Sequence, residues 1–294
     1  MKTEQERVEA DAPYRSLYRG QGVALLTQHG KEQVIAPVLA ATVGCLVERV
    51  AGYDTDLLGT FTRDIPRAGT RLEAARAKAR IGMNLSGRSL GLGSEGSFGL
   101  DPYVGMFPWN VEALLFIDDS RGIEVIGVAQ GKANSAQLLS TDRAEVEAFA
   151  RAVGFPEHYL ILRPEGPADT RIRKGISDWS GLKDAYAWAV SQSVSGKVFA
   201  EVDLRAHANP ARLAHIRQAA EDLGRRLGSL CPICNTPGFW VVESLLGLPC
   251  EACRSPTRQI RAEIHGCLKC PHRVTREPID REYADPGQCD VCNP

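Results

Sequence analysis

The sequence has no long apolar run and almost no net charge. The longest nearly uncharged stretch, Val34–Val47, is too short to cross a bilayer. A formal net charge of -1 gives no overall attraction to nucleic acid or to an anionic membrane, so any basic site must be local. The first 16 residues are charged and lack an apolar core, which argues against a secretory signal or a membrane anchor there. We therefore expect a soluble, cytoplasmic protein with no membrane partner.

Cysteine is nearly missing from the first 230 residues, where Cys45 stands alone. The other eight cysteines form four CxxC pairs, which are Cys231/Cys234, Cys250/Cys253, Cys267/Cys270 and Cys289/Cys292. Two such pairs supply the four thiolates of a closed tetrahedral Zn²⁺ site. Disulfides conflict with the expected compartment, and a thioredoxin-like redox role lacks its βαβ context. The pattern predicts two zinc ions that stabilise the fold and have no open position for catalysis.

The spacing leaves open which pairs share a metal. Sequential pairing (first with second, third with fourth) and interleaved pairing (first with third, second with fourth) satisfy it equally. His265 and His272 flank the third pair and could replace a thiolate, but eight cysteines already complete two sites. We interpret these histidines as solvated loop residues.

The chain divides into three parts by composition. Residues 1–19 form a polar lead, residues 20–229 an α/β nucleotide-binding-like domain, and residues 230–294 a small double zinc-knuckle or ribbon module. A helix with Asn209 as N-cap and Pro210 in its first turn leads directly into the first CxxC pair. With 44% hydrophobic residues, 294 residues can bury one large core or two moderate ones.

Strand and helix patterns alternate between residues 20 and 200. The pattern predicts a helix from Lys31 to Val50, another in "RLEAARAKARIGMNL", and a hairpin around Asp118–Gly122. Because a hairpin interrupts the alternation, we expect an α/β fold with a mixed central sheet and flanking helices.

The stretch "VALLTQHGKEQVIAPVL" places a polar turn between an apolar strand and an apolar helix. Such a turn directs the unpaired N–H groups and the positive dipole of the helix toward one point, where a phosphate binds well. It is not a Walker A loop, because "TQHGKE" lacks the first glycine and the hydroxyl. The candidate residues are Thr27, His29, Gly30 and Lys31, and the alternative is an ordinary turn with Thr27 as a helix cap.

Two further stretches support a nucleotide site. In "GTRLEAARAKARIG", Thr70 precedes a basic helix that carries Arg71 and Lys78. In "LGLGSEGSFG", Ser94 and the carboxylate Glu95 lie among glycines that let a ligand approach the backbone. A carboxylate can hold Mg²⁺ or activate water, while a lysine neutralises phosphate. The alternatives are a polar strand-end glutamate and a solvated helix lysine.

In this order the pieces resemble the inosine triphosphate pyrophosphatase superfamily of house-cleaning nucleotidases. The resemblance covers about residues 20–130 and departs from the family pattern at His29 (usually Asn) and Val34 (usually Glu). The third motif has Glu95 where many members have two acids, which bears on metal binding. The whole chain, with its C-terminal CxxC pairs, also resembles an uncharacterised bacterial family of unknown function.

The superfamily resemblance implies Mg²⁺-dependent hydrolysis of a nucleoside triphosphate to a monophosphate and pyrophosphate. Lys31 and Lys78 would hold phosphate oxygens, and Glu95 would bind Mg²⁺ or activate water. Thr27 and Ser94 would donate hydrogen bonds. Positioning and charge neutralisation would provide most of the catalysis.

A fourth cluster lies in "EVDLRAHANPARLAH", where strand alternation would place Glu201, Asp203, Arg205 and His207 on one face. Of these residues, Arg205 and His207, together with Arg212, suit phosphate or base recognition, and the alternative is a salt-bridged surface strand.

A second class of function stays open. It is a non-catalytic module that binds a nucleotide, a nucleic acid or a protein through the basic site and the zinc ribbon, and the absence of paired acids favours it. The sequence also leaves the oligomeric state open, a homodimer included.

Overall fold

The computed structural model describes residues 17–55, 69–277 and 281–294. The described chain forms two compact units, one up to Gly224 and one from Arg225 onward.

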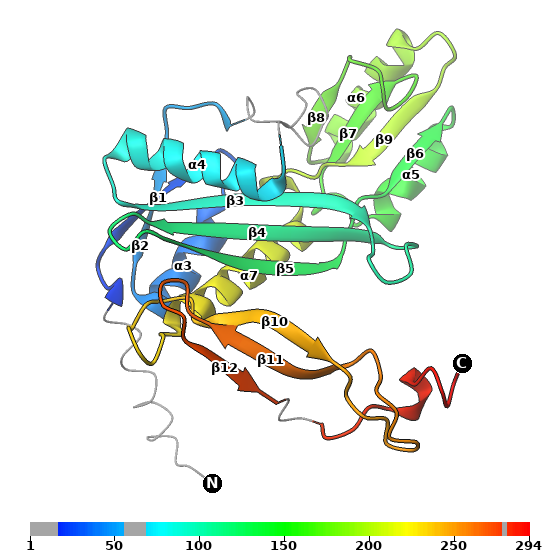
Figure 1. The fold of residues 1–294 in the computed structure, drawn as a ribbon. Coiled ribbons are helices and arrows are strands. Elements are labelled where there is room, and N and C mark those ends of the chain that lie inside the picture. The colour runs from blue at the N-terminus through cyan, green and yellow to red at the C-terminus, as the bar shows by residue number, and fades with distance from the viewer. Residues whose placement is uncertain (1–16, 56–68, 278–280) are drawn as a thin grey trace. The chain divides into compact units, whose positions relative to one another are not determined.

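The first unit is built on a five-stranded sheet in the order β2-β1-β3-β4-β5 (Figure 1). The strands are β1 (Gly22–Leu26), β2 (Leu46–Val50), β3 (Leu90–Leu100), β4 (Pro108–Asp118) and β5 (Ile123–Lys132). Strand β1 runs parallel to β2 and β3, whereas β3, β4 and β5 are antiparallel neighbours. The predicted mixed sheet with its hairpin is therefore confirmed.

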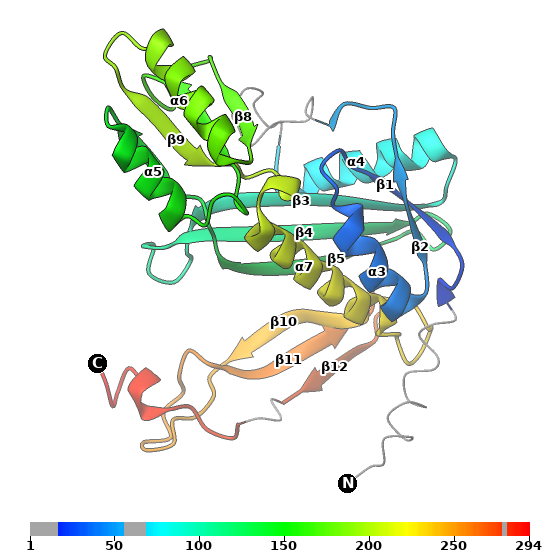
Figure 2. The same ribbon diagram turned by 180° about the vertical axis from the view of Figure 1, so that it is seen from behind.

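Helices cover both faces of this sheet. Helix α4 (Arg71–Ser86) lies on one face, and α3 (Glu32–Val43) and α7 (Pro210–Gly228) lie on the other (Figures 1 and 2). Glycine lets the layers approach closely, because a Cβ at Gly93 would lie 1.9 Å from the Ala75 carbonyl oxygen of α4. A Cβ at Gly127 would likewise lie 2.4 Å from the Ala219 carbonyl oxygen of α7. Small residues at these contacts thus set a tightly packed three-layer core.

A second, four-stranded antiparallel sheet follows in the chain, in the order β6-β9-β7-β8. Its strands are β6 (Gln137–Ser140), β7 (Leu160–Pro164), β8 (Arg173–Ile176) and β9 (Val198–Val202). Helices α5 (Arg143–Ala152) and α6 (Trp179–Gln192) share a buried apolar cluster with it. The alternating sequence patterns predicted α5, α6, β7 and β9, but not β6, β8 or the separation of this sheet from the central one.

Two predicted boundaries are wrong. The helix expected to run to Val50 ends at Val43, because Gly44 adopts the left-handed conformation (φ 74°) and closes it. Cys45, expected inside that helix, is buried just before β2.

The second wrong boundary concerns the fourth cluster. Strand β9 ends at Val202, and His207 lies in a short 3₁₀ helix, η2 (Ala206–Ala208). Asp203, Arg205 and His207 therefore do not line one strand face.

The second unit contains a three-stranded antiparallel sheet of β10 (Trp240–Leu246), β11 (Ile260–Gly266) and β12 (Arg273–Arg276). A short 3₁₀ helix, η3 (Pro286–Gln288), precedes the last CxxC pair. In neither unit do the described residues include a helix with the length and apolar character needed to cross a membrane.

Candidate functional site

Lys31 extends from the turn that joins β1 to α3. Gly30 in this turn has φ 69°, a conformation that favours glycine, and Lys31 is the N-cap of the helix. The ammonium donates hydrogen bonds to the Ser94 carbonyl oxygen at 2.9 Å and to the Ser94 hydroxyl at 3.2 Å. Burial lowers the pKa of Lys31 to about 7, helped by the charge of Arg212 and opposed by Glu95 and Glu112. The predicted lysine is thus a buried group beside β3.

Lys78 of α4 forms an ion pair with Glu95 of β3. Glu95 is almost completely buried, and the Lys78 side chain is mostly buried. The sequence predicted both residues for the same site, and the structure places them in direct contact. Lys78 is therefore not a solvated helix lysine, and Glu95 lies in the middle of β3 rather than at a strand end.

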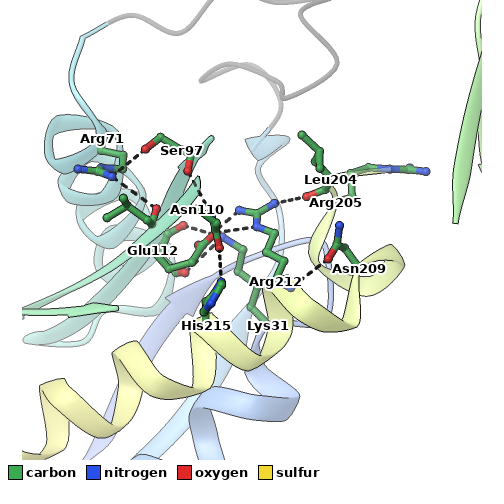
Figure 3. Close-up of polar contacts among 12 residues, drawn as sticks. Lys31, Arg71, Ser97, Asn110, Glu112, Leu204, Arg205, Asn209, Arg212 and His215 are labelled. Atoms are coloured by element: carbon green, nitrogen blue, oxygen red, sulfur yellow. Dashed lines mark hydrogen bonds and ion pairs between the residues drawn. The ribbon is translucent and has the colours of Figure 1, made fainter. Parts of the chain in front are cut away.

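Glu112 of β4 and Arg212 of α7 form a second buried ion pair, 2.8 Å from Nε to Oε1 (Figure 3). Arg212 also donates to the Leu204 carbonyl oxygen at 2.6 Å, and Asn110 donates to Glu112 at 3.0 Å. Burial raises the pKa of Glu112, but the charges of Arg212 and Lys31 outweigh it and hold that pKa below the ordinary value. Figure 3 shows Lys31 beside this pair.

Glycines, which have no side chain, leave room for the Glu112–Arg212 ion pair and its neighbours. A Cβ at Gly96 would lie 2.1 Å from Glu112 Oε1, so only glycine fits opposite the carboxylate. At Gly131 a Cβ would lie 2.6 Å from His215 Nε2. The other ring nitrogen of His215, Nδ1, lies 2.9 Å from Asn110 Oδ1.

Sequence reasoning did not identify Asn110, Glu112 or His215 as site residues. The sequence did contain a signal for two of them. Asn110 and Glu112 occupy alternate positions in the largely apolar strand "PWNVEALLFID", so both side chains face the same side of the sheet and would need polar partners if that side is buried.

Helix α4 presents its N-terminus near the same strands. Thr70 caps it, since its hydroxyl accepts from the Glu73 amide at 3.3 Å while the Glu73 carboxylate accepts from the Thr70 amide. Arg71 donates to the Ser97 hydroxyl at 2.7 Å. Thr70 therefore has a structural role, and Arg71 bridges α4 to β3.

The remaining predicted residues lie at the turn after β1 and in the segment between β9 and α7. Thr27 is buried, and its carbonyl oxygen accepts from Arg49 Nε at 3.2 Å. The rings of His29 and His207 lie 5.3 Å apart between centroids. Burial lowers the pKa of His207, and the neighbouring charge of Arg205 lowers it further. The structure thus brings the first and fourth predicted clusters together at one imidazole pair.

Asp203 is fully buried and has structural partners. Its carboxylate accepts from Arg205 Nε at 3.0 Å and from the Gly175 amide at 3.2 Å. Asn209 caps α7, as predicted, by accepting from the Arg212 amide at 3.0 Å. This cap fixes the first turn of α7, from which Arg212 reaches the buried Glu112.

The cysteines gather in two groups of four with interleaved pairing. One contains Cys231, Cys234, Cys267 and Cys270, and the other contains Cys250, Cys253, Cys289 and Cys292. The ligand atoms within each group lie within 4.8 Å of one another, so each group could hold a metal ion. Neither group includes His265 or His272, and His265 is not the solvated loop residue that was expected, because it is buried in β11.

The sulfur separations suit a tetrahedral thiolate site. The Sγ–Sγ distances include 3.5 Å for Cys234–Cys267 and 3.8 Å for Cys250–Cys292. A tetrahedron with metal–sulfur bonds of about 2.3 Å has edges of about 3.8 Å. No described cysteine is in a disulfide.

The donors for a hard cation are sparser. Across residues 17–55, 69–277 and 281–294, the groups of three or more candidate metal ligands are the two cysteine groups. Glu95 and Glu112 each face a cation of the protein. A Mg²⁺ ion at this place would need substrate phosphates to complete its oxygen shell.

Fold and site together define an α/β protein with a buried cluster of charged residues and a four-plus-four cysteine module. The chain belongs to the family described as "Domain of unknown function (DUF6671)", which matches residues 78–294. That range includes Glu95, Glu112, Arg212 and all eight paired cysteines, and it begins after Lys31. No curated protein and no solved structure matches the chain.

Proposed function

We propose that the buried charged cluster binds the phosphates of a nucleoside triphosphate and that the protein hydrolyses it to a monophosphate and pyrophosphate. One observation carries this proposal. Three cations and two carboxylates converge from the start of α3, from α4, from two neighbouring strands and from α7; they are Lys31, Lys78, Arg212, Glu95 and Glu112. Burying so many charges is costly, and a protein that retains them has a use for them.

Each group has a role in this reaction. Lys31 and Lys78 hold phosphate oxygens, and a phosphate next to Lys31 raises the depressed pKa of its ammonium and keeps it charged. When phosphate takes over Lys78, the Glu95 carboxylate is released to accept a proton from water. The water oxygen then bonds to the α-phosphorus as the bond to the pyrophosphate oxygen breaks. Mg²⁺, when bound with the substrate, neutralises the charge of the phosphates.

Base or phosphate recognition falls to His29 and His207 beside the cluster and to Arg212 within it. His29 and His207 present an imidazole pair at the turn that carries Lys31. Arg212 is held in place by Glu112 and by the Leu204 carbonyl oxygen. Fixed donors of this kind orient a substrate at little entropic cost.

We also propose that each cysteine group holds one Zn²⁺. Four thiolates fill all positions of a tetrahedral ion, so these ions stabilise the second unit and do not take part in hydrolysis.

Pyrophosphate release from a panel of standard and deaminated nucleoside triphosphates, with and without Mg²⁺, tests the hydrolase. Glu95→Gln is expected to abolish release. Glu124→Gln is the matched control. Glu124 is also a β-strand carboxylate that forms an ion pair with α4, here with Arg76 at 2.8 Å, but both side chains of this pair are partly exposed. Full activity of Glu95→Gln would remove that residue from the mechanism.

One observation favours a non-catalytic nucleotide-binding protein as the second candidate. Both carboxylates already face cations, so neither is poised as a base before a ligand arrives. Calorimetric binding of a nucleotide without pyrophosphate release from any triphosphate would support this alternative. Loss of binding in Lys31→Ala would then assign the same cluster to recognition.

A further inference from the structure

The ends of β3, β4 and β5 that are distant from α3 carry an apolar surface outside the charged cluster. Five large apolar residues at the end of β3 and in the β3–β4 connection are between 47% and 75% exposed; they are Leu100, Tyr103, Val104, Met106 and Phe107. We call these five residues the tip surface. In Figure 1 the strands extend past the N-terminal end of α4 to reach it.

The tip surface is a fixed structure because Asp101 organises the connection. One carboxylate oxygen of Asp101 accepts from the amides of Tyr103 and Val104, at 3.1 and 2.8 Å. The other accepts from the amides of Met106 and Phe107, both at 2.8 Å. With its backbone donors satisfied inward, the loop directs its apolar side chains outward. A partner therefore meets a preorganised surface that needs little ordering on binding.

Charge is almost missing from this region. Between Ser97 and Val111, and between Val128 and Lys132, the residues charged at neutral pH are Asp101, which is buried, and Lys132, which is exposed. The Lys132 ammonium lies 5.0 Å from the centre of the Phe107 ring. A charged partner would find few complementary groups on this surface. The cores of protein–protein interfaces are likewise depleted in charged residues, so the surface suits an apolar partner.

We propose that the tip surface is the interface through which two copies of this chain form a symmetric dimer. Five residues at these exposures, each with a full surface on the order of 200 Å², provide roughly 650 Å². A standard interface buries about 800 Å² on each partner, so the tip and its immediate surroundings supply that area. A two-fold axis uses the same patch on both copies, and an apolar patch matches itself without charge repulsion.

Analytical ultracentrifugation of the full chain tests the dimer. The wild type is expected to sediment as a dimer at micromolar concentration. Val104→Asp places a charge within the interface and is expected to raise the dissociation constant by about 100-fold. Val194→Asp is the matched control, since it makes the same change at a valine that is 99% exposed between α6 and β9. Circular dichroism verifies that both variants fold.

A second variant tests the fixed loop. Asp101→Asn keeps the shape of the side chain but turns one acceptor into a donor that faces backbone amides, so we expect dimerisation to weaken by about tenfold. A monomeric wild type, or a dimer that survives Val104→Asp, would overturn the proposal. Co-flotation of a monomeric wild type with phosphatidylcholine vesicles would instead assign the tip surface to lipid.

Discussion

Replacement of Gly96 by alanine tests the packing that holds Glu112 against Arg212. The new methyl carbon would lie 2.1 Å from Oε1, 2.5 Å from Cδ and 2.7 Å from Oε2 of Glu112. Ordinary contacts begin at about 3.4 Å, so the carboxylate has to retreat by about 1 Å. That movement breaks hydrogen bonds from Arg212 and Asn110 that are now 2.8 and 3.0 Å long.

The expected loss follows from the burial of this pair. Breaking a buried ion pair costs about 3–5 kcal/mol, and partial relaxation places Gly96→Ala near the lower end, at about 3 kcal/mol. For a unit of this size, such a loss lowers the unfolding temperature by about 6–12 °C. Thermal unfolding followed by circular dichroism measures it.

Gly99→Ala provides a matched control in the same strand. Nothing lies within 4 Å of a Cβ at Gly99, so the alanine should leave stability unchanged or raise it by up to about 1 kcal/mol. In a Glu112→Ala background, where the carboxylate is gone, Gly96→Ala should cost less than about 1 kcal/mol. Equal unfolding temperatures for Gly96→Ala and Gly99→Ala would show that the Glu112 site is not packed as described.

Three further predictions concern the cap, the buried lysine and the metals. Thr70→Ala removes the cap of α4 and should cost about 1 kcal/mol in urea unfolding; an unchanged midpoint would contradict the capping role. The pKa of Lys31 is lower in the folded protein than in the unfolded chain. Between about pH 7 and pH 10.5 the unfolded chain therefore binds more protons than the folded protein. The contribution of Lys31 to the free energy of unfolding consequently rises with pH across that window. Lys31→Met should therefore stabilise the protein more at pH 6.5 than at pH 10, and a pH-independent difference in unfolding temperature would refute this. Metal analysis should find two Zn²⁺ per chain, and Cys250→Ser should lose one of them while the group containing Cys231 keeps its ion.

Local sequence patterns correctly predicted those structural features that are determined by residues close together in the chain. The eight metal-ligating candidates follow from CxxC spacing, and the long strands β3 to β5 follow from alternation and a turn composition around Asp118. The cap of α7 by Asn209 is equally local. Lys31 and Ser94 were assigned to one site because each lies in a segment suited to binding phosphate. Lys31 follows a turn at the end of a strand, and Ser94 belongs to a glycine-rich strand.

What the sequence did not predict depends on long-range contacts. Glu112 and Arg212 are 100 positions apart, and only the folded sheet brings α7 over β4. The two cysteine pairings satisfy the same spacings, so the choice between them rests on the turns and strands that separate the pairs. The end of α3 was missed because apolar residues continue past Gly44, although that glycine is a local stop signal.

The interleaved pairing of the cysteine groups determines the order in which the two metal sites can be completed as the second unit is synthesised. The segment from Cys231 to Cys270 and the segment from Cys250 to Cys292 overlap, so a metal ion bound in either group would enclose part of the chain that the other group needs. As the chain is synthesised, the first group is complete only once Cys270 has emerged, when half of the second group is already present and unfilled. Until Cys292 follows, Cys250 and Cys253 are free to bind metal in the wrong combination. An insertion between Cys253 and Cys267 would lengthen both loops, whereas one between Cys270 and Cys289 would lengthen only the second.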